Sequence, residues 1–138
     1  TRLCRDWSSD VCSSDLASSG DIKIEAGGRI ILPSSAVSTG TELPAFGVSI
    51  LPASTSGMDA FTLAYPSAGV MKVIQSQSST AANVYASTDL TVVFGNTTGC
   101  VAVFAGSSQA AVFMGYSSSE WMVLAIRGTV AFATSGVT

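Results

Sequence analysis

The sequence predicts an all-β domain, an antiparallel β-sandwich or small barrel of the jelly-roll kind with about ten short strands. Three observations support this fold class. Short apolar runs recur along the chain at intervals of about ten residues. Clusters of Gly, Pro, Asn and Ser, such as "EAGG", "YPSAG" and "GNTTG", separate these runs and are typical of turns. No stretch keeps the apolar spacing of an amphipathic helix over several turns.

Each apolar run defines one expected strand. The run that starts at Leu90 places Leu90, Val92 and Phe94 on one face. The run "EWMVLAI" is apolar on both faces, which predicts a strand that is central in its sheet or covered on both sides. The expected strands, in chain order, are Ile22–Glu25, Arg29–Leu32, Gly47–Leu51, Ala60–Ala64, Val70–Gln75, Asn83–Ala86, Leu90–Phe94, Val101–Phe104, Ala111–Met114, Trp121–Ile126 and Thr129–Ala133.

The order of turns and strands also predicts how the strands connect. The last third of the chain is expected to form an antiparallel meander with tight connections. The chain has no exact internal repeat, so we expect successive hairpins rather than the coils of a repeat protein.

Residues 1–16 differ from the rest of the chain. They hold two of the three cysteines and two copies of Ser-Ser-Asp, with neither helical nor strand periodicity. Residues 6–16, "DWSSDVCSSDL", resemble one reading frame of a widely used short-read sequencing adapter, without a gap. Segments of such origin are set aside when a fold is derived. We therefore expect an artefactual, adapter-derived tail at 1–16 and a single β domain at 17–138.

The remainder of the chain carries little charge. Without residues 1–16 it keeps four of the six basic residues, six of the nine acidic residues and one cysteine, Cys100. A weakly acidic chain that is poor in Lys and Arg cannot neutralise phosphate backbones, so nucleic-acid binding is not expected. No apolar run reaches the ~18 residues of a membrane span, so no membrane association is expected either. With so few charged residues, the surface of the domain is expected to be apolar. We expect this surface to be buried in an assembly.

The residue types that catalysis needs are absent or scattered. Histidine, the commonest general acid–base group, does not occur. No zinc, calcium-loop, phosphate-loop or G-x-S-x-G pattern is present, so no cofactor, metal or catalytic serine is expected, and we predict that the protein is not an enzyme. Lys72 could act as the base for a serine, but the favoured interpretation is an exposed lysine that protects a sheet surface. A glycosidase would need two facing carboxylates from the scattered set Asp21, Glu25, Glu42, Asp59, Asp89 and Glu120.

Aromatic side chains are the remaining candidates for a binding surface. Tyr65, Tyr85 and Tyr116 form the candidate ligand or contact surface, since exposed rings with a polar neighbour can hold a sugar. Trp121 could join them, but it begins an apolar run and is expected in the core. The polar neighbours that would complete a glycan site are Asn83, Gln109 and Glu120. The expected core residues are Trp121, Val123, Phe94 and Phe104.

From Ala64 onward the chain has a recognisable order of strands and turns around one tryptophan. The segments are "YPSAGVMKVIQSQSSTAANVYAS", "DLTVVF" and "QAAVFMGYSSSEWMVLAIRGTVAFATS", in which the turn at Ser117–Ser119 precedes Trp121 and Val123. This pattern resembles virion structural proteins of tailed bacteriophages, among them head-decoration and fibre-type β domains. The resemblance implies a non-enzymatic capsid-decoration or fibre protein, located in the virion, that acts through self-association.

The resemblance also implies partners. It implies a homo-oligomer, with a trimer as the expected state, and capsid or tail proteins as further partners. The alternative function is a carbohydrate- or receptor-binding β module of a phage tail or a bacterial surface, with a glycan as its ligand.

Deleting residues 1–16 is expected to leave the melting temperature unchanged, because the sequence gives them no part in the β domain. Calorimetry of the full chain and of the deletion variant checks this. A loss of several degrees, which corresponds to roughly 1 kcal/mol in a domain of this size, would show that these residues belong to the fold.

Overall fold

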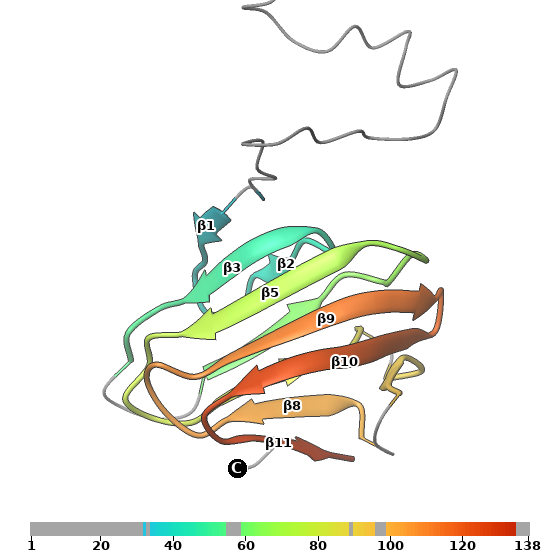
Figure 1. Cartoon of the computed structure of the whole chain (residues 1–138). Coiled ribbons are helices and arrows are strands. Elements are labelled where there is room, and N and C mark those ends of the chain that lie inside the picture. Colours follow the sequence, from blue (N-terminus) through green and yellow to red (C-terminus); the bar gives the residue numbers. More distant parts are fainter. Residues whose placement is uncertain (1–31, 33, 55–58, 89, 96–98, 135–138) are drawn as a thin grey trace, which may run out of the picture. The chain divides into compact units, whose positions relative to one another are not determined.

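The computed structural model describes residues 32, 34–54, 59–88, 90–95 and 99–134. The chain divides into two compact units, residues 1–31 and 32–138, and all described residues belong to the second. Within the described residues the structure is all-β, with eleven strands and no helix, which confirms the predicted class (Figure 1). The expected strand Ile22–Glu25 lies outside the described residues, and so does Arg29–Leu32 except for Leu32, which is in no strand.

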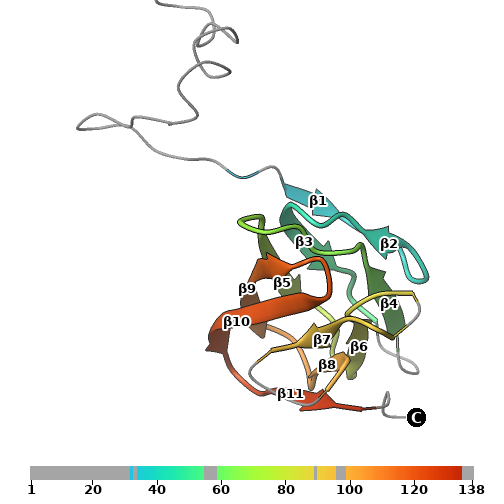
Figure 2. The ribbon, with the colours of Figure 1, turned by 90° about the vertical axis from the view of Figure 1, so that its right-hand side faces the viewer.

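The strands form two sheets, here called sheet A and sheet B, which Figure 2 shows as two layers. Sheet A contains, in spatial order, β1 (Ser34–Ala36), β3 (Gly47–Leu51), β5 (Met71–Ser76), β9 (Ala110–Ser117), β10 (Glu120–Arg127) and β7 (Val93–Phe94). Sheet B contains β11 (Val130–Ala133), β8 (Val101–Phe104), β6 (Ala82–Tyr85), β4 (Asp59–Leu63) and β2 (Glu42–Leu43).

The first six strands alternate between the two sheets and wind as a short β-solenoid. β1, β3 and β5 are parallel neighbours in sheet A, and β2, β4 and β6 are parallel neighbours in sheet B. Each turn of the winding adds one strand to each sheet, which makes about three turns. The expectation of successive hairpins in an antiparallel sandwich, jelly roll or barrel is therefore wrong for this half. The Gly, Pro and Ser clusters carry the chain from one sheet to the other, and their turn chemistry is the same as that of a hairpin.

The last five strands add the antiparallel pairs and one further parallel pair, which β7 forms with β10. β9 pairs with β5 and forms a hairpin with β10 through the turn at Ser118–Ser119, while β8 pairs with β6 and with β11. Only β9–β10 is a hairpin of the predicted meander, because the chain crosses to sheet B after Gly128. Leu90 has a positive φ of 58°, outside the strand region, so the strand expected from Leu90 shortens to β7. β1 and β2 lie between the expected strands Arg29–Leu32 and Gly47–Leu51, where the sequence predicted no strand.

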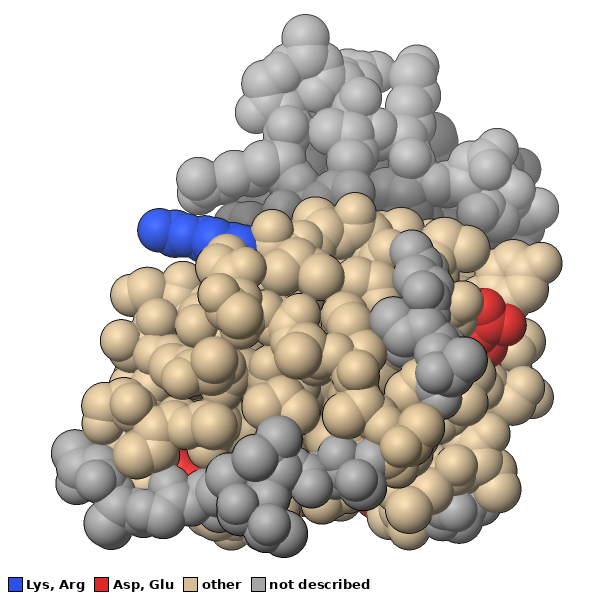
Figure 3. Space-filling model, turned by 90° about the horizontal axis from the view of Figure 1, so that it is seen from below, with Lys and Arg blue, Asp and Glu red and all other residues tan. Residues whose placement is uncertain are grey.

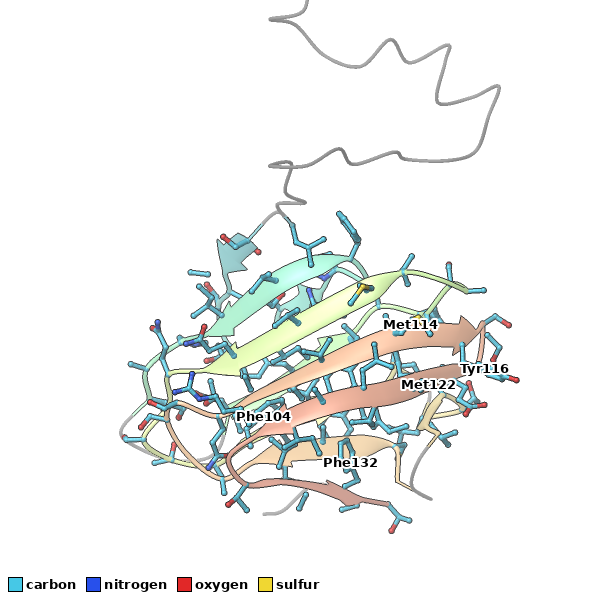
Figure 4. All side chains as sticks on the ribbon, viewed as in Figure 1. Phe104, Met114, Tyr116, Met122 and Phe132 are labelled. Atoms are coloured by element: carbon cyan, nitrogen blue, oxygen red, sulfur yellow. The ribbon has the colours of Figure 1, made fainter. Side chains whose placement is uncertain are left out.

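Side chains from the inner faces of both sheets form the main core. Every second residue of β3, β5 and most of β9 is buried, as expected when one face of a strand packs on a second sheet. Phe94 lies tilted against Phe113 and Phe132, with ring centroids 5.0 and 5.3 Å apart. Figure 4 labels Phe132 on β11 and Phe104 on β8. Of the expected core residues, Trp121, Phe94 and Phe104 are fully buried, and Val123 is half-buried against them.

One corner of the structure depends on a close approach between β9 and the connection that precedes β5. The Gly115 N–H donates to the Val70 carbonyl at 2.8 Å, and the Gly115 carbonyl accepts from the Gly69 N–H at 2.9 Å. A Cβ at Gly115 would overlap the carbonyl oxygen of Ser67 and lie 3.0 Å from Val70 Cγ2. Since backbone atoms cannot swing aside as a side-chain end can, only glycine fits here.

Gly115→Ala is therefore expected to destabilise the protein by about 1–3 kcal/mol, the usual cost of forcing a methyl group into a packed site. Gly106→Ala is the matched control, because its Cβ would meet only Gln109 Nε2 at 3.9 Å, an ordinary contact. Urea denaturation of both variants measures the difference. Equal stability of the two variants would contradict the close approach.

Candidate functional site

The outer face of sheet A, defined by the outward side chains of β3, β5, β9 and β10, is the candidate contact surface. Strand register arranges these side chains in rows that cross the sheet. One row consists of Met71, Met114 and Met122, and thus contains three of the four methionines of the chain. Figure 4 labels Met114 and Met122 on the neighbouring strands β9 and β10. The second row is Val48, Val73, Val112 and Ala125, and the third is Ile50, Gln75, Ala110 and Arg127.

These rows are apolar although they lie on the outside. Met71 is 38% exposed, and Leu124, the extra residue where the β9–β10 register shifts, is 46% exposed. Arg127, at one end of the third row, is the only charged side chain in the three rows. The surface seen from below Figure 1 is also almost uncharged where residues are described (Figure 3). A contiguous apolar face of this kind marks a site of interaction.

The three candidate tyrosines do not form one patch. Tyr116 is 59% exposed and points to the same side of β9 as Met114, so it borders the outer face of sheet A. Tyr65 is 48% exposed and lies in the connection whose Ser67 packs against Gly115, so it borders the same corner. Tyr85 is half-buried in sheet B.

Tyr85 belongs to a different environment from the other two rings. It packs with Ala81 against a second apolar cluster of Cys100, Val101 and Val103. Cys100 is a free, buried thiol that donates to the Thr134 carbonyl at 3.3 Å. Tyr85 is thus held by packing within sheet B and is separate from the outer face of sheet A.

The polar residues expected beside the tyrosines are dispersed. Asn83 is buried in β6. Gln109 precedes the opposite end of β9 from Tyr116, and its Oε1 accepts from the Ala105 N–H at 2.7 Å. Glu120 lies against Gly95. Trp121 is inside the core, so it offers no face to a sugar.

The prediction that Lys72 is exposed is wrong, because its side chain is fully buried. It points inward from β5 between Gly47 of β3 and Phe113 of β9, its neighbours in register. Its Nζ donates to Ser49 Oγ at 2.6 Å, and this hydroxyl is fully buried as well. The sequence missed the burial because Met71 and Val73 are as apolar as Ile74, so alternation alone does not show which side of β5 faces inward.

The environment of Lys72 changes its protonation. Desolvation by burial lowers the pKa of Lys72 from 10.5 to about 8, since the charged form loses its hydration. A lysine next to a serine hydroxyl is an arrangement that can activate a nucleophile. Here both side chains are closed off from solvent inside the core, so the pair affects the stability of the fold.

The part of the chain that the structure describes contains no group of three potential metal-ligating side chains. Among the described residues no helix has the length and apolar character needed to cross a membrane. No family model matches the sequence, and no curated protein matches it significantly.

The buried Lys72 predicts a stability that rises with pH. The unfolded lysine keeps its proton up to a pKa of about 10.5 and the folded one only up to about 8, so the free energy of unfolding increases between these values. The shift corresponds to roughly 3 kcal/mol, at about 1.4 kcal/mol for each pKa unit. Lys72→Met should be the more stable protein at pH 7 and should lose most of the rise.

Urea denaturation at pH 7, 8.5 and 10 measures both effects, and subtracting the Lys72→Met profile removes the contribution of other groups. Ser49→Ala serves as a second variant, because it removes the hydroxyl that accepts from Lys72 and should steepen the pH dependence. A wild-type profile parallel to that of Lys72→Met would contradict the burial of this amine.

Proposed function

We propose that this protein is a non-enzymatic structural component of a bacteriophage virion, a capsid-decoration or fibre-type β domain that functions through self-association. The observation that carries the proposal is the outer face of sheet A. Its three rows hold one charged side chain, and its exposed residues include Met71 and Leu124. In water such a face is stabilised by contact with another apolar surface.

The phage assignment is supported by the resemblance of the chain from Ala64 onward to virion structural proteins. Its closing element contains the β9–β10 hairpin, with Trp121 fully buried directly after the turn. Proteins that build a particle present extended faces to neighbouring copies, and a short solenoid with two sheets presents such a face. The expected state is a closed homo-oligomer, with a trimer proposed from the resemblance.

A second candidate function is carbohydrate or receptor binding on a phage tail or bacterial surface. The observation that favours it is the exposure of Tyr116 and Tyr65 near the Gly115 corner. Exposed tyrosines supply rigid, amphipathic contact area for a glycan. Tyr116→Ala would then abolish glycan binding, whereas Tyr85→Phe, a change on sheet B, would leave it intact.

Sedimentation velocity from about 1 to about 300 μM, a range in which weak protein contacts become populated, tests the leading proposal. The mass is expected to rise with concentration to that of a defined oligomer. A monomer at every concentration would contradict self-association. Retention on a glycan array, lost in Tyr116→Ala, would then favour the receptor-binding function.

A further inference from the structure

We infer that the outer face of sheet A docks against the same face of a second copy of this chain, with the row Met71, Met114 and Met122 at the centre of the contact. This inference rests on the proposed self-association and specifies its surface and symmetry. The contact is isologous, so each copy presents the same side chains to the other.

The first argument is the chemistry of the face. The three rows contain a single charged side chain, Arg127, at the end of the row farthest from the methionines. Two copies can therefore approach without facing like charges at the centre of the contact. A different partner would be selected by charge complementarity, and the centre of this face has no charge with which to select one.

The second argument is the placement of the methionines. Met114 on β9 lies between Met71 on β5 and Met122 on β10, so the row spans three adjacent strands. Methionine is unbranched and adapts its shape, which is why it is frequent on surfaces that form contacts. A row that can repack against its own copy does not need a shaped partner.

The third argument compares the area of the outer face with the area that a standard interface buries. Four strands about 4.8 Å apart, each with about five residues at 3.3 Å per residue, cover roughly 300 Å² in plan. A standard interface buries about 800 Å² of accessible surface on each partner. Even with side-chain relief and the bordering Tyr116 and Leu124, the face gives a weak contact. It is suited to copies held at high local concentration, as in a particle.

The symmetry of the contact has a consequence for the oligomer. A two-fold contact joins copies in pairs and cannot close a trimer. If a trimer forms through another surface, this face joins two trimers. The inference therefore predicts an even number of copies in the complete assembly.

A charge exchange at Met114 tests the inference. Met114→Lys and Met114→Glu each place like charges opposite each other across the two-fold contact, so each variant should self-associate about tenfold or more weakly than the wild type. An equimolar mixture of the two variants should recover association, because opposite charges then face each other. Ala60→Lys, a change at an exposed position of β4 in sheet B, is the matched control and should behave as the wild type.

Sedimentation velocity of the full chain gives the readout, and circular dichroism with thermal melting confirms that each variant is folded. Weakened single variants with a recovered mixture support the inference. Wild-type association of both single variants would overturn it while leaving the proposed function in place. Loss of association without recovery in the mixture would also overturn it, because the face would then contact a different surface. A wild-type protein that stays monomeric would overturn both the inference and the proposed function.

Discussion

Sheet A packs on sheet B, and this packing stabilises the strands of both sheets. A single turn of two short strands cannot bury its own inner face, so each turn is stable only when its neighbours cover it. β2 and β7 are two residues long and would not form alone. They exist because Leu43 and Phe94 are fully buried in the shared core.

The packing of the two sheets also buries Lys72, the core residue whose desolvation is the most unfavourable. Lys72 occupies an inward position that an aliphatic residue would fill at lower free energy, and among the described residues its hydrogen-bond acceptor is the neutral Ser49 hydroxyl. A buried amine without a facing carboxylate is stabilised by losing its proton, which is the origin of its low pKa. Gly47, next to Lys72 in register, is buried and has a positive φ of 87°, a conformation that favours glycine.

The outer face of sheet A is formed by strands that also contribute side chains to the core. β9 and β10 are apolar on both faces, and β5 adds Met71 and Val73 to the outer face, so apolar side chains remain at the surface as well as in the core. Strands with this composition are usually covered on both sides. A second copy of the chain would provide the missing cover and remove Met71 and Met122 from water. Stability of the domain and its assembly thus draw on the same strands.

Patterns of adjacent residues were sufficient to predict the all-β class and many of the strands. Apolar runs and turn residues predicted β3 and β8 to the residue, together with the buried Trp121 and the β9–β10 hairpin. These features depend on local periodicity and turn chemistry, which neighbouring residues in the sequence determine.

Strand direction, the partners of each strand and the inward side of β5 depend on contacts between residues that are distant in the sequence. A Gly or Ser cluster reverses the chain equally well within a sheet and between two sheets. The residues of a turn therefore do not indicate whether the strands wind in parallel. β1 and β2 are too short to show a period. Lys72 faces inward because β3 and β9 pair with β5 in one register, and register is set by packing over long sequence separations.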